Sequence, residues 1–286
     1  MDDQTHDSNR ITTALLLAAG TGSRLMPITS NSPKCLTLVN EQSILERLVI
    51  NLKKQGFKRL VVVTGYQENC IKDFLAKISG DLTIEFVYSP LYRTTNNIYS
   101  LWMARKIINE PFVLFEADLI FDVTLLDNMV YPDHMATSSL LPWMNGTTVT
   151  VDASHQVKGF HKNTTPINVE EVKYKTVNIY SFSLQSWKAI VKRLDIHIEA
   201  NNVNGYYETV IGELVADNRI SLKSVDFDNK YWYEVDTIED LKEAEKLFAL
   251  AVKKPLLSKI SIGKNLEKLK QFPKGLNTRG AQLATS

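Results

Sequence analysis

The first half of the chain alternates between apolar runs and segments with helical spacing. The stretches 14–19 and 59–66 are almost continuously apolar, which is typical of strands buried on both faces of a sheet. Between them, residues 43–57 place apolar residues at helical spacing and end near Gly56, which predicts a helix with a glycine C-cap. We expect further helices at 69–78 and 97–108, and further strands at 83–89 and 112–122. This alternation predicts a parallel sheet with helices on both faces.

After Pro132 the pattern changes to shorter strands mixed with helices. Residues 147–162 have the alternation of a hairpin, and the remaining expected elements are strands at 172–183 and 221–227 and helices at 184–194, 206–217 and 237–252. The predicted fold is α/β: a doubly wound, mostly parallel, Rossmann-like mixed sheet with helices on both faces. The predicted organisation is a disordered N-terminus at 1–10, one domain at 11–252 and a basic tail or linker at 253–286.

Composition narrows the class of protein. The chain has 286 residues, 44% hydrophobic and 23% charged, with a formal net charge of +1, so it has the balance of a soluble globular protein without an overall bias toward nucleic acid. Its two cysteines, Cys35 and Cys70, suggest neither a disulfide framework nor a zinc site, which fits a reducing cytoplasm. We expect no secretory signal in the acidic N-terminus and no transmembrane segment.

The apolar run at 14–19 leads into Gly20-Thr21-Gly22, followed by Arg24 and Lys34. In doubly wound sheets ligands bind beyond the carboxyl ends of the strands, and glycines let the backbone approach an anion. Two cations beside bare amides suit a polyphosphate. The loop is not a dinucleotide fingerprint, because Leu25 stands where the third glycine would be, and it is not a Walker loop. On the glycines alone, a turn with ordinary surface charges is an equally good interpretation.

Two aspartates in separate strand contexts form a second candidate cluster. Asp118 lies near the end of the apolar stretch FEADLIF, and Asp236 lies in YEVD. Carboxylates from two strands suit Mg²⁺, which keeps several waters and bridges phosphates. The alternative is structural: Asp118 caps a turn and Asp236 caps the last helix. Glu116 shares a strand face with Asp118 by alternation and is a candidate supporting group.

A longer pattern is more specific than these single residues. LAAGTGSRLMPITSNSPKCL resembles the signature L-A-A-G-x-G-x-R-L-x-P-x-T…P-K of nucleotidyltransferases that couple a nucleoside triphosphate to a phosphorylated small molecule. VVVTGY, TNNIYSLWMA, FEADLIF, YETVIGEL and YWYEVDTIEDLKEAE follow in the family's order, so the resemblance covers roughly residues 11–250. TNNIYSL and Tyr-Glu-Val-Asp look most like the phosphocholine and 2-aminoethylphosphonate cytidylyltransferase branch. Sugar-nucleotide members usually carry a Gly-rich segment where this chain has TTNN.

The resemblance implies a fold of the nucleotide-diphospho-sugar transferase type and a Mg²⁺-dependent enzyme of the EC 2.7.7 class that favours CTP. A phosphate or phosphonate oxygen of the acceptor attacks the α-phosphorus in line, and pyrophosphate leaves. By resemblance, Arg24 holds the β- and γ-phosphates, Lys34 neutralises charge on the α-phosphate, and Asp118 and Asp236 hold the metal. The implied nucleotide contacts are Leu17, Ala18, Ala19, Gly20, Thr21 and Gly22.

The remaining candidates surround the base and the acceptor. We expect Gly65 and Tyr66 to border the nucleobase and ribose, and the amides of Asn96 and Asn97 can read a pyrimidine edge. Helix capping is an equally good interpretation of the two asparagines. A quaternary ammonium acceptor needs aromatic faces and a carboxylate. The candidates for this site are Tyr180, Tyr206, Tyr207, Glu208 and Trp232, with Lys173 or Lys175 for the acceptor phosphate.

Two competing functions remain open from the sequence: a sugar-1-phosphate nucleotidyltransferase and a non-catalytic nucleotide-binding module. The combined set of Arg24, Lys34, Asp118 and Asp236 argues against the module, because binding alone does not need it. Residues 250–286 contain eight Lys or Arg and one acid. A loosely docked tail is the first interpretation of this segment, ahead of a basic arm or a linker. A homodimer and a fusion to an aminotransferase, which some family members have, are further expectations.

Overall fold

The computed structural model describes residues 10–142, 144–161 and 173–252. Within it, the chain up to residue 251 forms one compact unit. The predicted N-terminal stretch 1–9 and the predicted tail 253–286 lie outside the described residues, so the proposed domain boundaries remain predictions. Arg10, the first described residue, donates a hydrogen bond to the backbone oxygen of Gln55 at 2.7 Å.

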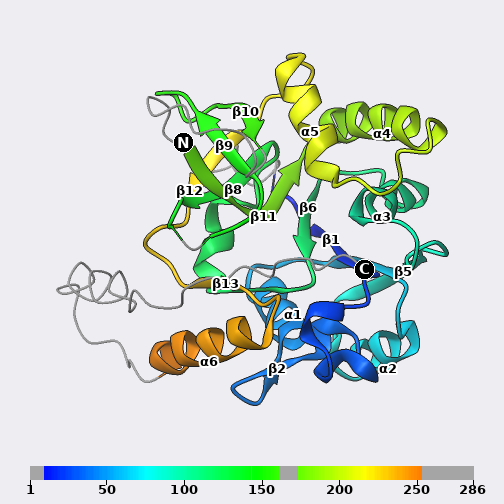
Figure 1. The fold of residues 1–286 in the computed structure, drawn as a ribbon, viewed down its shortest axis with the longest axis vertical. Coiled ribbons are helices and arrows are strands. Elements are labelled where there is room, and N and C mark those ends of the chain that lie inside the picture. Colours follow the sequence, from blue (N-terminus) through cyan, green and yellow to red (C-terminus); the bar gives the residue numbers. More distant parts are fainter. Residues whose placement is uncertain (1–9, 143, 162–172, 253–286) are drawn as a thin grey trace, which may run out of the picture. The chain divides into compact units, whose positions relative to one another are not determined.

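A nine-stranded mixed sheet forms the centre of the described structure (Figure 1). Four neighbouring strands are parallel, in the order β5–β4–β1–β6: β5 (Thr83–Tyr88), β4 (Arg59–Thr64), β1 (Thr13–Ala18) and β6 (Phe112–Glu116). The long strand β11 (Lys173–Phe182) then pairs antiparallel with β6 and continues the sheet. Around it lie β8 (His134–Ser139), β9 (Thr148–Val151), β10 (Val157–His161) and β12 (Lys223–Asp226). The predicted α/β class with a mixed sheet is confirmed.

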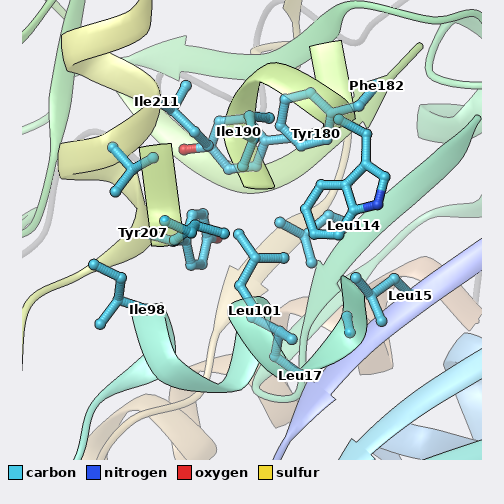
Figure 2. Packing of buried hydrophobic residues seen from close by; sticks show 14 of the residues in the cluster. Leu15, Leu17, Ile98, Leu101, Leu114, Tyr180, Phe182, Ile190, Tyr207 and Ile211 are labelled. Atoms are coloured by element: carbon cyan, nitrogen blue, oxygen red, sulfur yellow. The ribbon is translucent and has the colours of Figure 1, made fainter. Parts of the chain in front are cut away.

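Helices cover both faces of the parallel strands, because alternate residues of each strand point in opposite directions. In β1, Leu15 and Leu17 join a hydrophobic cluster with α3 (Asn97–Met103), α4 (Leu184–Glu199) and α5 (Tyr207–Ala216), as Figure 2 shows. Leu16 faces the opposite way and packs with α1 (Ile44–Lys54) and α2 (Glu68–Ile78). All six residues of β1 are buried, as its continuous apolar run predicts.

Local signals explain where several elements begin and end. The Ser43 hydroxyl accepts a hydrogen bond from the Glu46 N–H at 3.1 Å and caps α1, and Gly56 after that helix has a φ of +75°. Short 3₁₀ turns complete the connections: η2 (Ser23–Leu25), η3 (Ile28–Ser30), η4 (Lys34–Leu36), η5 (Ala104–Lys106) and η6 (Val123–Asn128). No helix in the described ranges is both long and apolar enough to cross a membrane.

The predicted strand 112–122 is wrong in one respect, because it is two strands. β6 ends at Glu116, and β7 (Leu119–Phe121) pairs with β13 (Trp232–Glu234) in a separate two-stranded sheet. A second small sheet pairs β2 (Leu38–Val39) with β3 (Gln42–Ser43). Both pack with the C-terminal helix α6 (Ile238–Val252) in a third hydrophobic cluster, whose buried members include Leu25, Ile44, Ile120, Val235 and Phe248. This cluster fixes the β6–β7 break and the end of β13 near the loop after β1.

Candidate active site

The loop after β1 is held in shape by a glycine in the left-handed region. Gly22 has a φ of +63°, and a Cβ there would lie 3.0 Å from Lys34 Cβ and 3.2 Å from Thr29 Cγ2. The Thr29 hydroxyl donates to the Gly22 oxygen at 2.8 Å. Glycine is therefore needed both for the backbone conformation and for the close approach of Lys34.

Gly65 and Tyr66, after the end of β4, contact both ends of this loop. The Tyr66 N–H donates to the Ala19 oxygen at 3.0 Å, and its hydroxyl lies 2.6 Å from the Ser30 oxygen. A Cβ at Gly65 would lie 2.6 Å from the same Ala19 oxygen and 2.7 Å from Tyr92 Cγ. Neither residue lines the cavity described next, so their contact with the base and the ribose stays a prediction.

A polar cavity of about 270 Å³ opens beyond the carboxyl ends of β1 and β6. It lies where doubly wound sheets bind their ligands. The predicted site residues that line it are Leu17, Ala18, Ala19, Gly20, Gly22, Arg24, Lys34, Asn96, Asn97, Asp118 and Asp236. The predicted site residues that do not line it are Thr21, Gly65, Tyr66, Lys175, Tyr180, Glu208 and Trp232.

The two predicted cations and the two predicted metal ligands meet at one end of this cavity. The Lys34 ammonium lies 2.7 Å from Asp118 Oδ2 and 2.5 Å from Asp236 Oδ1, and Arg24 donates to the same Asp236 oxygen at 2.7 Å. Lys34 is largely buried, with 14% of its side chain exposed, whereas Arg24 is 68% exposed. Burial lowers the pKa of Lys34, but the two aspartates raise it by more, so the net shift is upward and the ammonium stays charged.

Hydrogen bonding distinguishes the metal interpretation of the aspartates from the capping one. At the start of α6 it is Thr237 that caps: its hydroxyl accepts from the Asp240 N–H at 3.1 Å, and Asp240 accepts from the Thr237 N–H at 2.8 Å. The Asp236 carboxylate faces Lys34 and Arg24 instead. Asp118 points one oxygen at Lys34, and its buried Oδ1 has no hydrogen-bond partner in the described residues.

These carboxylates fit a divalent cation bound mostly through phosphate and water. Asp118 and Asp236 already converge on one cationic group, and the unpartnered Asp118 Oδ1 leaves a ligand atom free. Among the described residues no group of three or more His, Cys, Asp or Glu is arranged to hold a metal ion. Two carboxylates with outside ligands are the arrangement that suits Mg²⁺ rather than zinc or calcium.

Asn96 and Asn97 are in part structural, as the capping alternative predicts. The Asn96 side chain accepts from the Asn97 N–H at 2.8 Å and caps α3. The Asn97 amide donates to Glu116 Oε1 at 3.2 Å and accepts from the Tyr207 N–H at 3.0 Å. Asn97 therefore joins β6 to the start of α5, and Asn96 is the amide less committed to internal bonds.

Lys175 lies in a buried polar group behind the cavity. Its ammonium is 3.5 Å from Glu234 Oε2 and donates to the Thr176 oxygen at 2.7 Å. Asn178 has a φ of +59° at an irregularity in β11, and its amide donates to Glu234 Oε1 at 2.7 Å. Burial raises the pKa of Glu234, and Asp118 and Asp236 add to this while Lys175 and Lys34 oppose it. Glu234 thus connects Lys175 to the segment that carries Asp236, two residues further along the chain.

Of the predicted aromatic residues of the acceptor site, Tyr206 lines the cavity and Tyr180, Tyr207 and Trp232 do not. Tyr180 and Tyr207 are fully buried, and their rings make an edge-to-face contact with centroids 5.8 Å apart (Figure 2). Trp232 is half-buried and pairs with Phe121 in the β7–β13 sheet. Glu208 is 7% exposed, and its Oε2 has no hydrogen-bond partner in the described residues.

Sequence reasoning missed several polar and aromatic residues of the cavity wall: Ser23, Tyr92, Thr95 and Ser100. Tyr92 and Thr95 lie in the turn between β5 and α3, where the sequence offers no periodic signal. Ser100 lies on α3 one turn after Asn96, so its position could have been inferred from helical spacing.

The fold is an α/β fold with two cations and two carboxylates gathered at the carboxyl ends of its strands. The chain belongs to the nucleotidyl transferase family, whose model matches residues 13–160, just over half of its length. This match includes Arg24, Lys34 and Asp118 but not Asp236.

Known proteins with similar sequences include a CMP-phosphonate synthase and cytidylyltransferases. The chain is 26% identical over 245 residues to the CMP-5'-(3-aminopropyl)phosphonate synthase of Streptomyces rubellomurinus, covering 82% of this chain and 38% of that protein. It is 32% identical over 108 residues to the choline-phosphate cytidylyltransferase of Streptococcus pneumoniae, covering 38% and 45%. The CTP:phosphoglutamine cytidylyltransferase of Campylobacter jejuni is 23% identical over 261 residues, covering 80% and 97%. The chain thus spans less than half the length of the first two relatives.

Solved structures share the fold. The CTP:phosphocholine cytidylyltransferase from Streptococcus pneumoniae superposes with a TM-score of 0.71 at 19% identity, over 84% of this chain and 99% of the other. An inositol-1-phosphate CTP transferase from T. maritima gives a TM-score of 0.68 at 17% identity, over 87% and 99%. At these identities the likeness establishes the nucleotide-diphospho-sugar transferase type of fold and no more.

Proposed function

We propose that this chain is a Mg²⁺-dependent cytidylyltransferase that joins CTP to phosphocholine or to a phosphonate such as 2-aminoethylphosphonate. The observation that supports this most is the convergence of Arg24, Lys34, Asp118 and Asp236 at one end of the cavity. Simple nucleotide binding needs cations, but it does not need two carboxylates that converge on one of them. The cytidylyltransferases among its relatives support the choice of CTP.

In the proposed reaction, an acceptor oxygen forms a bond to the α-phosphorus while the bond to the bridging oxygen of the β-phosphate breaks. Lys34 and Arg24 neutralise charge on the phosphates, and the backbone from Ala18 to Gly22 cradles them. Asp118 and Asp236 would hold Mg²⁺, which supplies further charge neutralisation on the phosphate oxygens when bound. Positioning and charge stabilisation therefore provide the catalysis, and no general acid is required.

The position of the Lys34 ammonium also matters for the proposed binding of Mg²⁺. In the structure the ammonium lies between the two carboxylates, so a Mg²⁺ ion bound to the same two oxygens would displace it from them. The long, flexible side chain of lysine allows such a movement.

The test is a measurement of pyrophosphate release in the presence of Mg²⁺. CTP, UTP, dTTP, ATP and GTP are each combined with phosphocholine, 2-aminoethylphosphonate and glucose-1-phosphate. We expect turnover with CTP and an aminated acceptor, and its loss in Asp118→Ala. Asp127→Ala is the matched control, because Asp127 is an exposed carboxylate on η6 that binds Gln55 and does not line the cavity. Turnover with glucose-1-phosphate alone would support the sugar-nucleotide alternative, and no turnover with any pair would contradict the proposal.

A further inference from the structure

Two glutamates, one half-buried and one buried, lie on two elements that meet beside the cavity. Glu116, at the end of β6, lines the cavity, and Glu208 lies in the first turn of α5 with 7% of its surface exposed. Asn97 connects their two elements, because its amide binds both Glu116 and the Tyr207 N–H next to Glu208. The Oε2 atom of Glu208 has no hydrogen-bond partner in the described structure.

The cations near these glutamates are already occupied by other groups. Lys175 binds the Thr176 oxygen and lies 3.5 Å from Glu234, while Lys34 lies between Asp118 and Asp236. A buried carboxylate with an unpartnered oxygen is costly, so a donor supplied by a ligand would relieve this arrangement.

The chemistry of the cavity wall favours hydrogen-bond donors over a methylated cation. A trimethylammonium group has no N–H and is normally held against aromatic faces. The predicted aromatic candidates Tyr180 and Trp232 do not line the cavity. Of the aromatic residues that do line it in the described chain, Tyr92 already has the Arg93 guanidinium 5.4 Å from its ring centroid, which leaves Tyr206. An ammonium with three N–H donors matches a wall of carboxylate, amide and hydroxyl oxygens better.

We propose that Glu116 and Glu208 form the binding site for a primary ammonium group of the acceptor, and that the chain therefore prefers a primary amine to a quaternary one. Glu116 contacts the ammonium from the cavity wall, and Glu208, which is buried and does not line the cavity, adds negative charge nearby. This inference rests on the proposed cytidylyltransferase function and selects between the two kinds of acceptor that it leaves open.

The test is a methylation series on one acceptor. 2-Aminoethylphosphonate and its N-methyl, N,N-dimethyl and N,N,N-trimethyl forms are assayed with saturating CTP and Mg²⁺, and kcat/KM is measured for each. We expect kcat/KM to fall along the series, by about tenfold or more between the primary and the trimethyl form, as loss of hydrogen bonds to a charged group implies. Glu208→Gln is expected to reduce kcat/KM for the primary amine and to leave the trimethyl form nearly unchanged, which flattens the series.

Glu213→Gln is the matched control. Glu213 lies on the same helix but binds Arg193 and His197. Its variant should therefore keep the wild-type ratio of kcat/KM between the primary and the trimethyl acceptor. A trimethyl acceptor that is used as well as the primary amine would overturn this inference alone, and so would a Glu208→Gln variant of wild-type melting temperature whose ratio is unchanged. If no member of the series is used but phosphocholine is, this inference alone fails; if phosphocholine is not used either, the proposed function fails with it. The wild-type series requires no variant, so it decides the question even if Glu208→Gln does not fold.

Discussion

The ammonium of Lys34 separates two carboxylates that would otherwise face each other. It lies 2.7 Å from an oxygen of Asp118 and 2.5 Å from an oxygen of Asp236, and the side chains of all three residues are mostly buried. The two oxygens are at most about 5 Å apart, a distance at which two unit charges repel by about 3 kcal/mol at an effective dielectric constant of about 20. Replacing Lys34 with methionine keeps an unbranched side chain one heavy atom shorter and removes the charge.

We expect Lys34→Met to lower the free energy of unfolding by about 3 kcal/mol, because removing one partner of a buried ion pair costs about 3–5 kcal/mol. Urea unfolding at pH 7, followed by circular dichroism, measures the change. Arg24→Met is the control: Arg24 binds the same Asp236 oxygen but is mostly exposed, so its loss should cost about 1 kcal/mol or less. A loss in Lys34→Met no larger than in Arg24→Met would refute the argument that the ammonium holds these carboxylates together.

The same variant tests the metal proposal without any turnover. With Lys34 gone, Asp118 and Asp236 are free to bind a cation, so Mg²⁺ should stabilise Lys34→Met more than it stabilises the wild type. At a Mg²⁺ concentration ten times the Kd, the gain is about 1.4 kcal/mol. An equal effect of Mg²⁺ on both proteins would count against the assignment of these two carboxylates to the metal.

Two further substitutions test the close packing behind the loop after β1 and the ion pair at the start of β1 and β4. Gly65→Ala should cost about 1–3 kcal/mol of unfolding free energy, because its Cβ would lie 2.6 Å from the Ala19 oxygen. Gly20→Ala is the control and should change stability little, because a Cβ there would have no atom within 4 Å. Equal losses for the two variants in urea unfolding would contradict this reasoning. For Glu110, burial raises the pKa, but the Thr13 hydroxyl and Arg59 lower it by more, so the net shift is downward from 4.5. Its contribution to stability is therefore present above about pH 4.5 and lost as the pH falls through the lowered value. Glu110→Gln should lower the free energy of unfolding at pH 7, and this variant should lose less stability than the wild type on acidification. If both proteins show the same dependence of stability on pH, the Glu110 carboxylate does not contribute to stability in this way.

Elements with strong local signals were predictable from the sequence. The strands at 14–19 and 59–66 are continuous apolar runs, and the helix after Ser43 has both a capping residue and a glycine after its end, so local and tertiary preferences agree. The gathering of Arg24, Lys34, Asp118 and Asp236 follows from a similar argument. Residues at the carboxyl ends of neighbouring parallel strands share one edge, and the family signature supplied the rest.

Features that depend on distant pairing were not predictable. The break between Glu116 and Leu119 arises because β7 pairs with β13, more than a hundred residues later, and FEADLIF itself shows no interruption. β8 was missed because HMATSS lacks an apolar run, although its middle residues are buried between β11 and β12. For Tyr180 the sequence identifies an aromatic residue but not which face of β11 it occupies, and that face is the hydrophobic core.

The order in which the site residues occur along the chain has a consequence for folding. Arg24, Lys34 and Asp118 are synthesised early, but Asp236 follows β13, which must find β7 across more than a hundred intervening residues. Closing so long a loop carries an entropic cost, which the β7–β13 pairing and the packing of α6 in the third hydrophobic cluster offset. A nascent chain that has not yet folded its C-terminal helix therefore has the glycine loop but lacks the second carboxylate. If Asp236 is the second metal ligand, as proposed, the site is completed only when the C-terminal part of the domain has folded.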